Sequence, residues 1–161
     1  EAQRQPHTDI QGRLRNAIRV FTETGARLRM PYYLSLLARM LYNAGQFDES
    51  LNALNDALAE SRKNNEHWWD AELHRLRGEL IWSQGANADE VEVVFLHSIE
   101  IAQSQQAKSL ELRTATSLAR LWQANFRSAE AKQLLVPVYQ WFTEGFDTPD
   151  LQAALALIVQ L

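Results

Sequence analysis

Small and apolar residues recur along this chain at intervals of 40 to 41 residues. The pattern has three positions, spaced four and then three residues apart. They are occupied by Ile10, Ser50, Val91 and Ala131; by Leu14, Leu54, Phe95 and Leu135; and by Ala17, Ala57, Ser98 and Val138. An offset series consists of Leu37-Ala38, Arg77-Gly78 and Leu118-Ala119, followed three residues later by Leu41, Ile81 and Trp122. A fixed period of this length is typical of helical repeat proteins, in which each helix pair buries its apolar face by stacking on its neighbours.

The spacing of apolar residues within each period predicts helices throughout, and no strand fits the pattern. We expect about eight helices, in which inner and outer helices alternate. They are an outer helix of a truncated repeat at 9–24, three inner–outer pairs within 31–63, 67–105 and 108–143, and a terminal capping helix at 149–160. The sequence therefore predicts an all-α fold, with residues 1–161 forming one solenoid domain of stacked antiparallel helix pairs.

One position of the pattern stays small in every repeat. Gly78 interrupts a good helical segment, which costs about 1 kcal/mol relative to alanine. The equivalent residues are Ala38 and Ala119, and the outer helices also carry small residues, as at Ala57 and Ser98. We therefore expect the two helices of each pair to approach closely at this level.

Composition narrows the class of protein. With 46% hydrophobic and 22% charged residues the chain has the composition of an ordinary globular protein. A net charge of -4 argues against a general nucleic-acid binder. The absence of cysteine excludes disulfides, thiol catalysis and thiolate zinc sites. No apolar run reaches 18 residues, so we expect no membrane partner and a cytoplasmic location. Because the chain begins at Glu1 and its repeats are cut at both ends, we interpret it as a piece of a larger protein.

The repeat pattern resembles that of the tetratricopeptide repeat. It shares the small residue followed by an apolar one in the first helix, and the small–large–small spacing in the second. The units are longer than the usual 34 or so residues, and they lack the usual tryptophan near the start of the first helix and the proline after the second. The resemblance implies a right-handed superhelix whose inner face binds a partner.

A narrower resemblance covers three segments, at 66–80, 107–113 and 137–151. They are similar to the C-terminal helical region of large bacterial multidomain signalling proteins. In those proteins a class III adenylate/guanylate cyclase domain, or a DNA-binding domain of the LuxR type, precedes a P-loop ATPase and then tetratricopeptide-like repeats. This resemblance implies a regulatory helical domain. The chain has no G-x-x-x-x-G-K-[ST] motif, so any nucleotide chemistry would lie outside it.

The predicted binding surface is the concave face of the inner helices. It is rich in aromatic and arginine side chains, which often contribute most of the binding energy at interfaces. The candidate residues are Tyr32, Arg39, Tyr42, Asn43, Glu72, Arg75, Glu79, Trp82, Arg113, Arg120 and Gln123. The arginines could bind acidic groups through paired hydrogen bonds. The alternative is a solvated face with ion pairs from Arg75 to Glu72 and Glu79 at helical spacing.

Other candidate sites are weaker. Glu66, Asp70 and His74 could share one helix face as metal ligands, but we interpret them as a solvent-facing structural cluster. Trp122 and Trp141 fall on core positions of the repeat and are expected to pack inside. We expect no catalytic residue, metal or cofactor, and therefore no enzyme activity.

The sequence thus favours a non-catalytic interaction or regulatory module. Its partner would be a peptide, another protein or the ATPase domain of its own chain, and not nucleic acid. The alternative is a sensor domain that binds a small effector and controls an upstream cyclase or transcription regulator. The oligomeric state is left open, including a dimer formed through the cut ends.

Overall fold

A computed structural model describes residues 6–161, with side chains described from residue 10 onward. Within this range the chain is all-α, as predicted, with eight α-helices and one short 3₁₀ helix. The helices are α1 (Pro6–Glu23), α2 (Met30–Asn43), α3 (Phe47–Asn64), η1 (His67–Trp69), α4 (Asp70–Ser83), α5 (Ala88–Ser104), α6 (Lys108–Ala124), α7 (Ser128–Gln140) and α8 (Pro149–Gln160).

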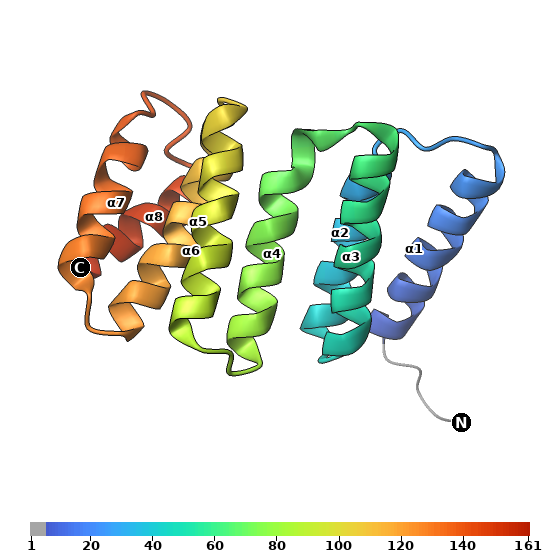
Figure 1. The fold of residues 1–161 in the computed structure, drawn as a ribbon, viewed down its shortest axis with the longest axis horizontal. Helices are drawn as coiled ribbons and strands as arrows, with labels where there is room; N and C mark the ends of the chain where they lie inside the picture. Colours follow the sequence, from blue (N-terminus) through green and yellow to red (C-terminus); the bar gives the residue numbers. More distant parts are fainter. Residues whose placement is uncertain (1–5) are drawn as a thin grey trace.

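The helices stack along one long axis, with α1 at one end of the molecule and the C-terminus at the other (Figure 1). Consecutive helices form antiparallel pairs, α2 with α3, α4 with α5, and α6 with α7. The inner helices also contact one another in series, α2 with α4, α4 with α6, and α6 with α8. Each outer helix contacts the next inner helix, as α3 does α4 and α5 does α6. This is the stacking expected of a helical repeat fold.

The repeat positions found in the sequence form the core. In α3, α5 and α7 every residue of the three-position pattern is buried, and Ala57, Phe95 and Leu135 are completely buried. α1 is the exception, because Ile10 is 51% exposed. The pattern in α1 matches that of the other outer helices, but α1 contacts chiefly α2 and therefore buries much less of its apolar face.

The inner helices α2, α4 and α6 end in the same turn. Gly45, Gly85 and Phe126 occupy equivalent positions, and all three have the left-handed backbone conformation, with φ of 74°, 82° and 61°. In each case the amide of the following residue donates to a carbonyl five residues earlier, as in the bond from Gln46 to Leu41. This hydrogen-bonded turn closes an α-helix with a left-handed residue, for which glycine is best suited. The third repeat instead has a phenylalanine, which is 98% exposed.

The hydrophobic core is divided into two main clusters. One lies among α2, α3 and α4, and the other among α5, α6, α7 and α8. α4 contributes to both, since Leu73 and Leu80 belong to the first cluster whereas Ile81 and Trp82 pack against the second. The facing sides of α4 and α6 carry buried polar and charged residues between these clusters.

The close approach predicted at the small position is present between α4 and α5. A Cβ atom placed on Gly78 would lie 2.5 Å from Cε1 of Phe95, a distance at which something must move. Phe95 is completely buried within a packed core cluster, so its ring cannot move aside without displacing its neighbours or reaching the surface. The small residue at this level is therefore required by the ring of the facing helix.

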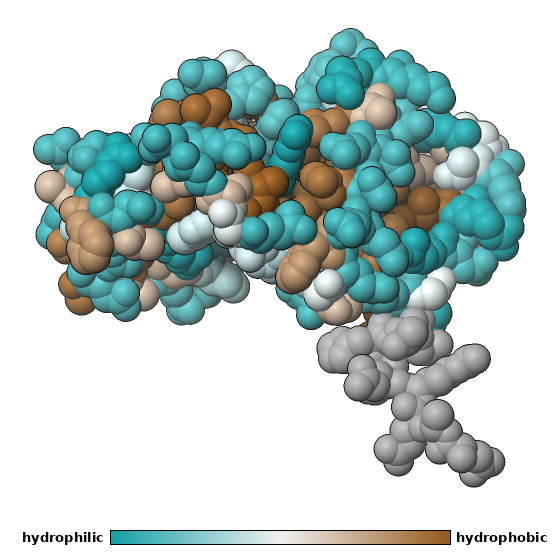
Figure 2. Space-filling model, turned by 60° about the horizontal axis from the view of Figure 1, so that its bottom comes forward, coloured by the Kyte–Doolittle hydropathy of each residue, from teal (hydrophilic) through white to brown (hydrophobic). Residues whose placement is uncertain are grey.

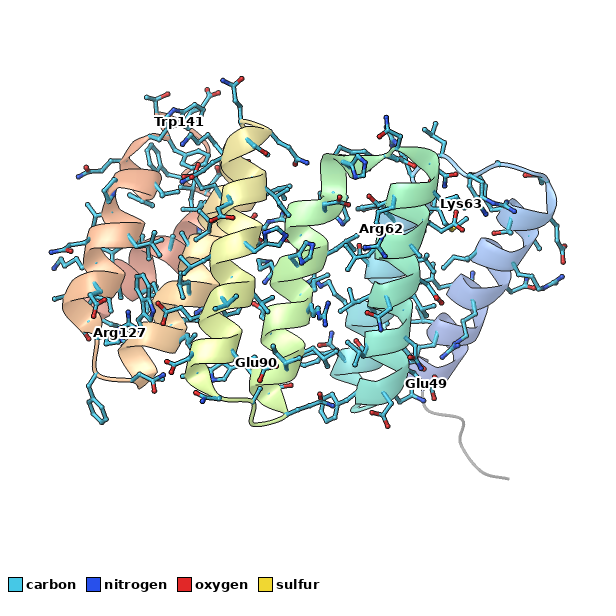
Figure 3. All side chains as sticks on the ribbon, viewed as in Figure 1. Glu49, Arg62, Lys63, Glu90, Arg127 and Trp141 are labelled. Carbon is cyan, nitrogen blue, oxygen red and sulfur yellow. The ribbon has the colours of Figure 1, made fainter. Side chains whose placement is uncertain are left out.

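Some helix boundaries differ from those predicted. α1 begins at Pro6, three residues early, because proline suits the first turn of a helix. The first turn of the helix expected at 67 is the 3₁₀ helix η1. α7 ends at Gln140, so Trp141 lies past its last turn and is 58% exposed. The prediction that Trp141 packs inside was therefore wrong, whereas Trp122 is buried as predicted. Trp141 and Arg127 mark the two ends of α7 (Figure 3).

Hydrophilic residues cover much of the face shown in Figure 2, with smaller hydrophobic areas among them. The outline narrows near the middle of the long axis in this view. In the part of the chain that the structure describes, no helix combines the length and apolar character needed to cross a membrane.

Candidate functional site: a charged groove on the inner helices

A groove of about 310 Å³ lies on the inner helices. Side chains from α2, α4 and α6 form most of its walls, α8 contributes Asp150 and Ala153, and Ser50 and Leu54 of α3 also line it. We call this depression the inner groove. It draws on residues that are far apart in the sequence and that only the stacking of repeats brings together.

The inner groove contains most of the predicted binding residues. Eight of the eleven line it, namely Arg39, Tyr42, Asn43, Glu72, Arg75, Glu79, Arg113 and Arg120. Trp82 lines an adjoining shallow depression together with Tyr42 and Arg120. Tyr32 and Gln123 line neither. Tyr32 instead packs among aromatic rings at the start of α2, stacked on Trp68 with ring centroids 6.1 Å apart.

A buried ion pair forms the floor of the inner groove. Arg75 donates from Nε and Nη2 to the two carboxylate oxygens of Glu72, at 2.8 and 2.7 Å. Arg75 also donates to Glu79, which accepts a further hydrogen bond from Ser117 Oγ at 2.8 Å. Ser117 belongs to α6, so this network joins α4 to α6. Glu72 is 2% exposed and Arg75 9% exposed.

Burial by itself lowers the pKa of the Arg75 guanidinium, because removal from water disfavours the charged form. The hydrogen bonds and negative charge of Glu72, with the charges of Glu79 and Asp150, outweigh that effect and raise its pKa. Arg75 therefore stays charged and fully engaged. The ion pairs expected under the solvated-face alternative are present, but Glu72 and Arg75 are not solvated.

A second ion pair connects α6 to the last helix. Arg113 Nε donates to Asp150 Oδ2 at 2.6 Å, and its Nη1 lies 3.8 Å from Glu72. Asp150 was not among the residues predicted to line the concave face, yet it lines the inner groove. The sequence did contain a signal for Asp150. The last helix follows the third pair in the series, so it takes the place of a fourth inner helix beside α6, and Asp150 lies in its first turn.

Arg39 and Arg120 differ from these two arginines. Both are exposed, and neither forms a hydrogen bond or an ion pair with any residue whose side chain is described. They occupy the same position of the repeat, 40 residues before and 41 residues after Glu79. The inner groove thus contains two arginines with ion-pair partners, the buried Arg75 and the partly exposed Arg113. It also contains two exposed arginines without such partners, Arg39 on α2 and Arg120 on α6.

The residues considered as metal ligands have structural partners. Asp70 accepts a hydrogen bond from Ser61 and lies 2.8 Å from His67 Nδ1. Glu66 Oε1 accepts from the backbone amide of Arg29 at 2.7 Å. Among the described side chains, no group of three histidine or acidic residues is placed to bind a metal ion. These contacts join η1 and the start of α4 to α3 and to the segment before α2.

His74 is a half-buried residue on the side of α4 that faces α5. Burial, followed by the charge of the neighbouring His97, lowers its pKa from 6.5 to about 4. The two imidazole rings meet edge to face, with centroids 4.7 Å apart. His74 lines neither depression on the inner helices, so it belongs to the packing between α4 and α5.

Comparison with known proteins adds little to this picture. No protein-family model matches the chain. An uncharacterized protein of Rhizobium meliloti (strain 1021) is 31% identical over 121 residues, which cover 75% of this chain. The chain spans about 12% of the length of that relative. The fold itself defines the class of protein, an all-α helical repeat protein with a charged groove on its inner helices.

Proposed function

We propose that this chain is a non-catalytic interaction and regulatory module of a bacterial signalling protein, and that it works in the cytoplasm. Its inner groove binds a segment of another protein, a peptide, or the ATPase domain of its own chain. The observation that carries the proposal is the inner groove, a cavity of about 310 Å³ that four successive inner helices build together.

The chemistry of the lining supports a protein or peptide as the ligand. Tyrosine and arginine dominate the energetics of many protein interfaces, and Tyr42, Arg39 and Arg120 are accessible in or beside the groove. The buried pair of Glu72 and Arg75 fixes the floor before any ligand arrives. A rigid floor lowers the entropy lost on binding.

The comparison supports a role within a larger protein. The relative matches this chain over only a small part of its own length. A helical repeat region in such a protein is well suited to contact other domains, since its inner helices form a continuous surface.

The test fills the inner groove without changing its charge. Asn43 is exposed and lines the groove, so Asn43→Trp places an indole in it. Asn55 is exposed on α3 and does not line the groove, and Asn55→Trp is the matched control. Partners are captured from a lysate by cross-linking, identified by mass spectrometry and tested again as purified proteins. We expect the control to bind as the original chain does and Asn43→Trp to lose binding. A partner that binds both variants equally would overturn the proposal.

The second candidate is the small-effector sensor. The volume of the inner groove lies at the lower end of the range for small-molecule sites. That class of site is mostly apolar, whereas this groove is lined mainly by charged and polar side chains. A low-molecular-weight fraction of the lysate that raises the melting temperature of Asn55→Trp but not of Asn43→Trp would favour the sensor.

A further inference from the structure

We infer that the inner groove recognises an extended acidic segment of a protein partner, and that Arg39 and Arg120 are the residues that select it. This inference rests on the proposed function and adds to it the chemical class of the ligand. Arg39 and Arg120 enter from opposite sides of the groove, on α2 and α6, with α4 between them.

The inner groove has more positive than negative side chains. Its lining contains four arginines and three acidic residues. The three acids, Glu72, Glu79 and Asp150, are all bound to Arg75 or Arg113. No negative charge of the groove is therefore left for Arg39 and Arg120. An excess of positive charge in a partly enclosed groove attracts a negatively charged ligand.

The ion pairs that the arginines already form decide which of them can select a ligand. Arg75 donates to both oxygens of the buried carboxylate of Glu72, and Arg113 donates to Asp150. A ligand that used Arg75 would leave the buried carboxylate of Glu72 without its partner. A ligand that used Arg113 would have to compete with its existing ion pair to Asp150. Arg39 and Arg120 are exposed, so a ligand carboxylate displaces only water from them.

The repeat geometry sets the spacing of the acidic groups. Arg39, Glu79 and Arg120 lie at the same level of three successive inner helices. Packed helix axes lie about 8–10 Å apart, so the backbones at Arg39 and Arg120 are separated by roughly 16–20 Å. An extended chain advances about 3.3 Å per residue, so glutamates four residues apart are separated by about 13 Å. Two arginine side chains that reach toward one groove can cover the remaining distance.

The test uses a capped heptapeptide with glutamate at its second and sixth positions, labelled with an uncharged dye. Binding is measured by fluorescence anisotropy at two salt concentrations. The protein variants are Arg39→Gln and Arg120→Gln, with Arg62→Gln as the matched control. Arg62 is an exposed arginine of α3 that lies outside the groove (Figure 3). Circular dichroism melts establish that all variants are folded.

We expect each groove variant to weaken binding about tenfold or more, because each removes a charge-assisted hydrogen bond. The control should bind as the original chain does, and added salt should weaken binding. Replacing one glutamate of the peptide by glutamine should abolish the effect of one arginine variant and leave the effect of the other. That pairing would also give the direction in which the peptide lies.

A peptide with glutamine at both positions separates this inference from the proposed function. If it binds as tightly as the acidic peptide and Asn43→Trp blocks both, the groove binds peptides and the acidic preference is wrong. If neither arginine variant changes the affinity for the acidic peptide, the inference is likewise overturned. Acidic-peptide binding that Asn43→Trp leaves intact would count against the inner groove itself, and so against both proposals.

Discussion

The backbone of Gly78 lies against the ring of Phe95, so that a β-carbon on Gly78 would lie only 2.5 Å from Cε1 of the ring. The contact joins the two helices of the central pair at the level where every repeat has a small residue. It explains why a glycine is kept in the middle of α4 in spite of its low helix propensity.

Gly78→Ala should therefore destabilise the protein, although alanine is the better helix former. Overpacking of a filled core costs about 1–3 kcal/mol, which exceeds the gain of about 1 kcal/mol in helix propensity. Gly78→Leu should destabilise it more. The measurement is the free energy of unfolding in urea. In the background of Phe95→Leu the ring is absent, and Gly78→Ala should become neutral or stabilising. A destabilisation of equal size in both backgrounds would contradict the contact.

The pair of Glu72 and Arg75 gives the second prediction. Arg75→Met should lower the free energy of unfolding by about 3 kcal/mol or more, because it leaves the buried carboxylate of Glu72 without its bidentate partner. The double variant Glu72→Leu, Arg75→Met removes both charges and should recover most of the loss. Chemical denaturation of Arg75→Met, Glu72→Leu and the double variant tests this coupling. If the double variant is as unstable as the two single losses combined, the ion pair is not the cause.

The turn at Phe126 gives the third prediction. Phe126 has φ of 61° and is almost fully exposed, so its ring contributes little packing. Phe126→Gly should raise the free energy of unfolding by about 1 kcal/mol, because glycine adopts this conformation without strain. Gly85 has the same conformation in the second repeat, and a β-carbon there would meet nothing within 4 Å. Gly85→Ala should therefore lower the free energy of unfolding by a similar amount, because of the backbone conformation alone. Thermal melts of the two variants should shift in opposite directions.

The lowered pKa of His74 gives the fourth prediction. It is lowered by burial and by His97 to about 4, whereas an unfolded chain has the ordinary value of 6.5. Between these two pH values the unfolded chain binds a proton that the folded protein does not. The free energy of unfolding should therefore fall as the pH is lowered from 6.5 to 4, and His74→Gln should show a smaller fall. Urea melts across this range test the loss of stability, and NMR titration of the imidazole tests the pKa. A His74 ring that titrates near 6.5 in the folded protein would contradict the prediction.

Much of the fold follows from the sequence, because the repeat period records which positions are buried. The residues at those positions in α3, α5 and α7 are the core residues of the structure. The burial of α1 could not be obtained in the same way. Its pattern is that of an outer helix, yet Ile10 is largely exposed, because burial depends on the neighbours of a helix as well as on its own residues. Trp141 was misplaced for a local reason, since the helix ends one residue before it.

The sequence was enough to predict which inner helices form the candidate site, but not which of its side chains pair with one another. Placing residues on the inner faces of successive helices was enough to find Arg39, Glu79 and Arg120. Helical spacing also shows that Arg75 can reach Glu72, but not that α6 covers the pair and removes it from water. The bond between Arg113 and Asp150 joins residues 37 positions apart. It depends on how the last helix packs, which no local pattern describes.

The division of the hydrophobic core bears on how the molecule responds to force and to partial unfolding. The cluster of α2, α3 and α4 and the cluster of α5 to α8 both involve α4, and we expect them to unfold as two cooperative units. Hydrogen exchange should therefore show two levels of protection rather than one. A ligand held between Arg39 and Arg120 would touch both units at once. It would link the two units across α4. A force that pulls the ends of the solenoid apart would then be resisted by the bound segment as well as by the ion pair of Glu72 and Arg75.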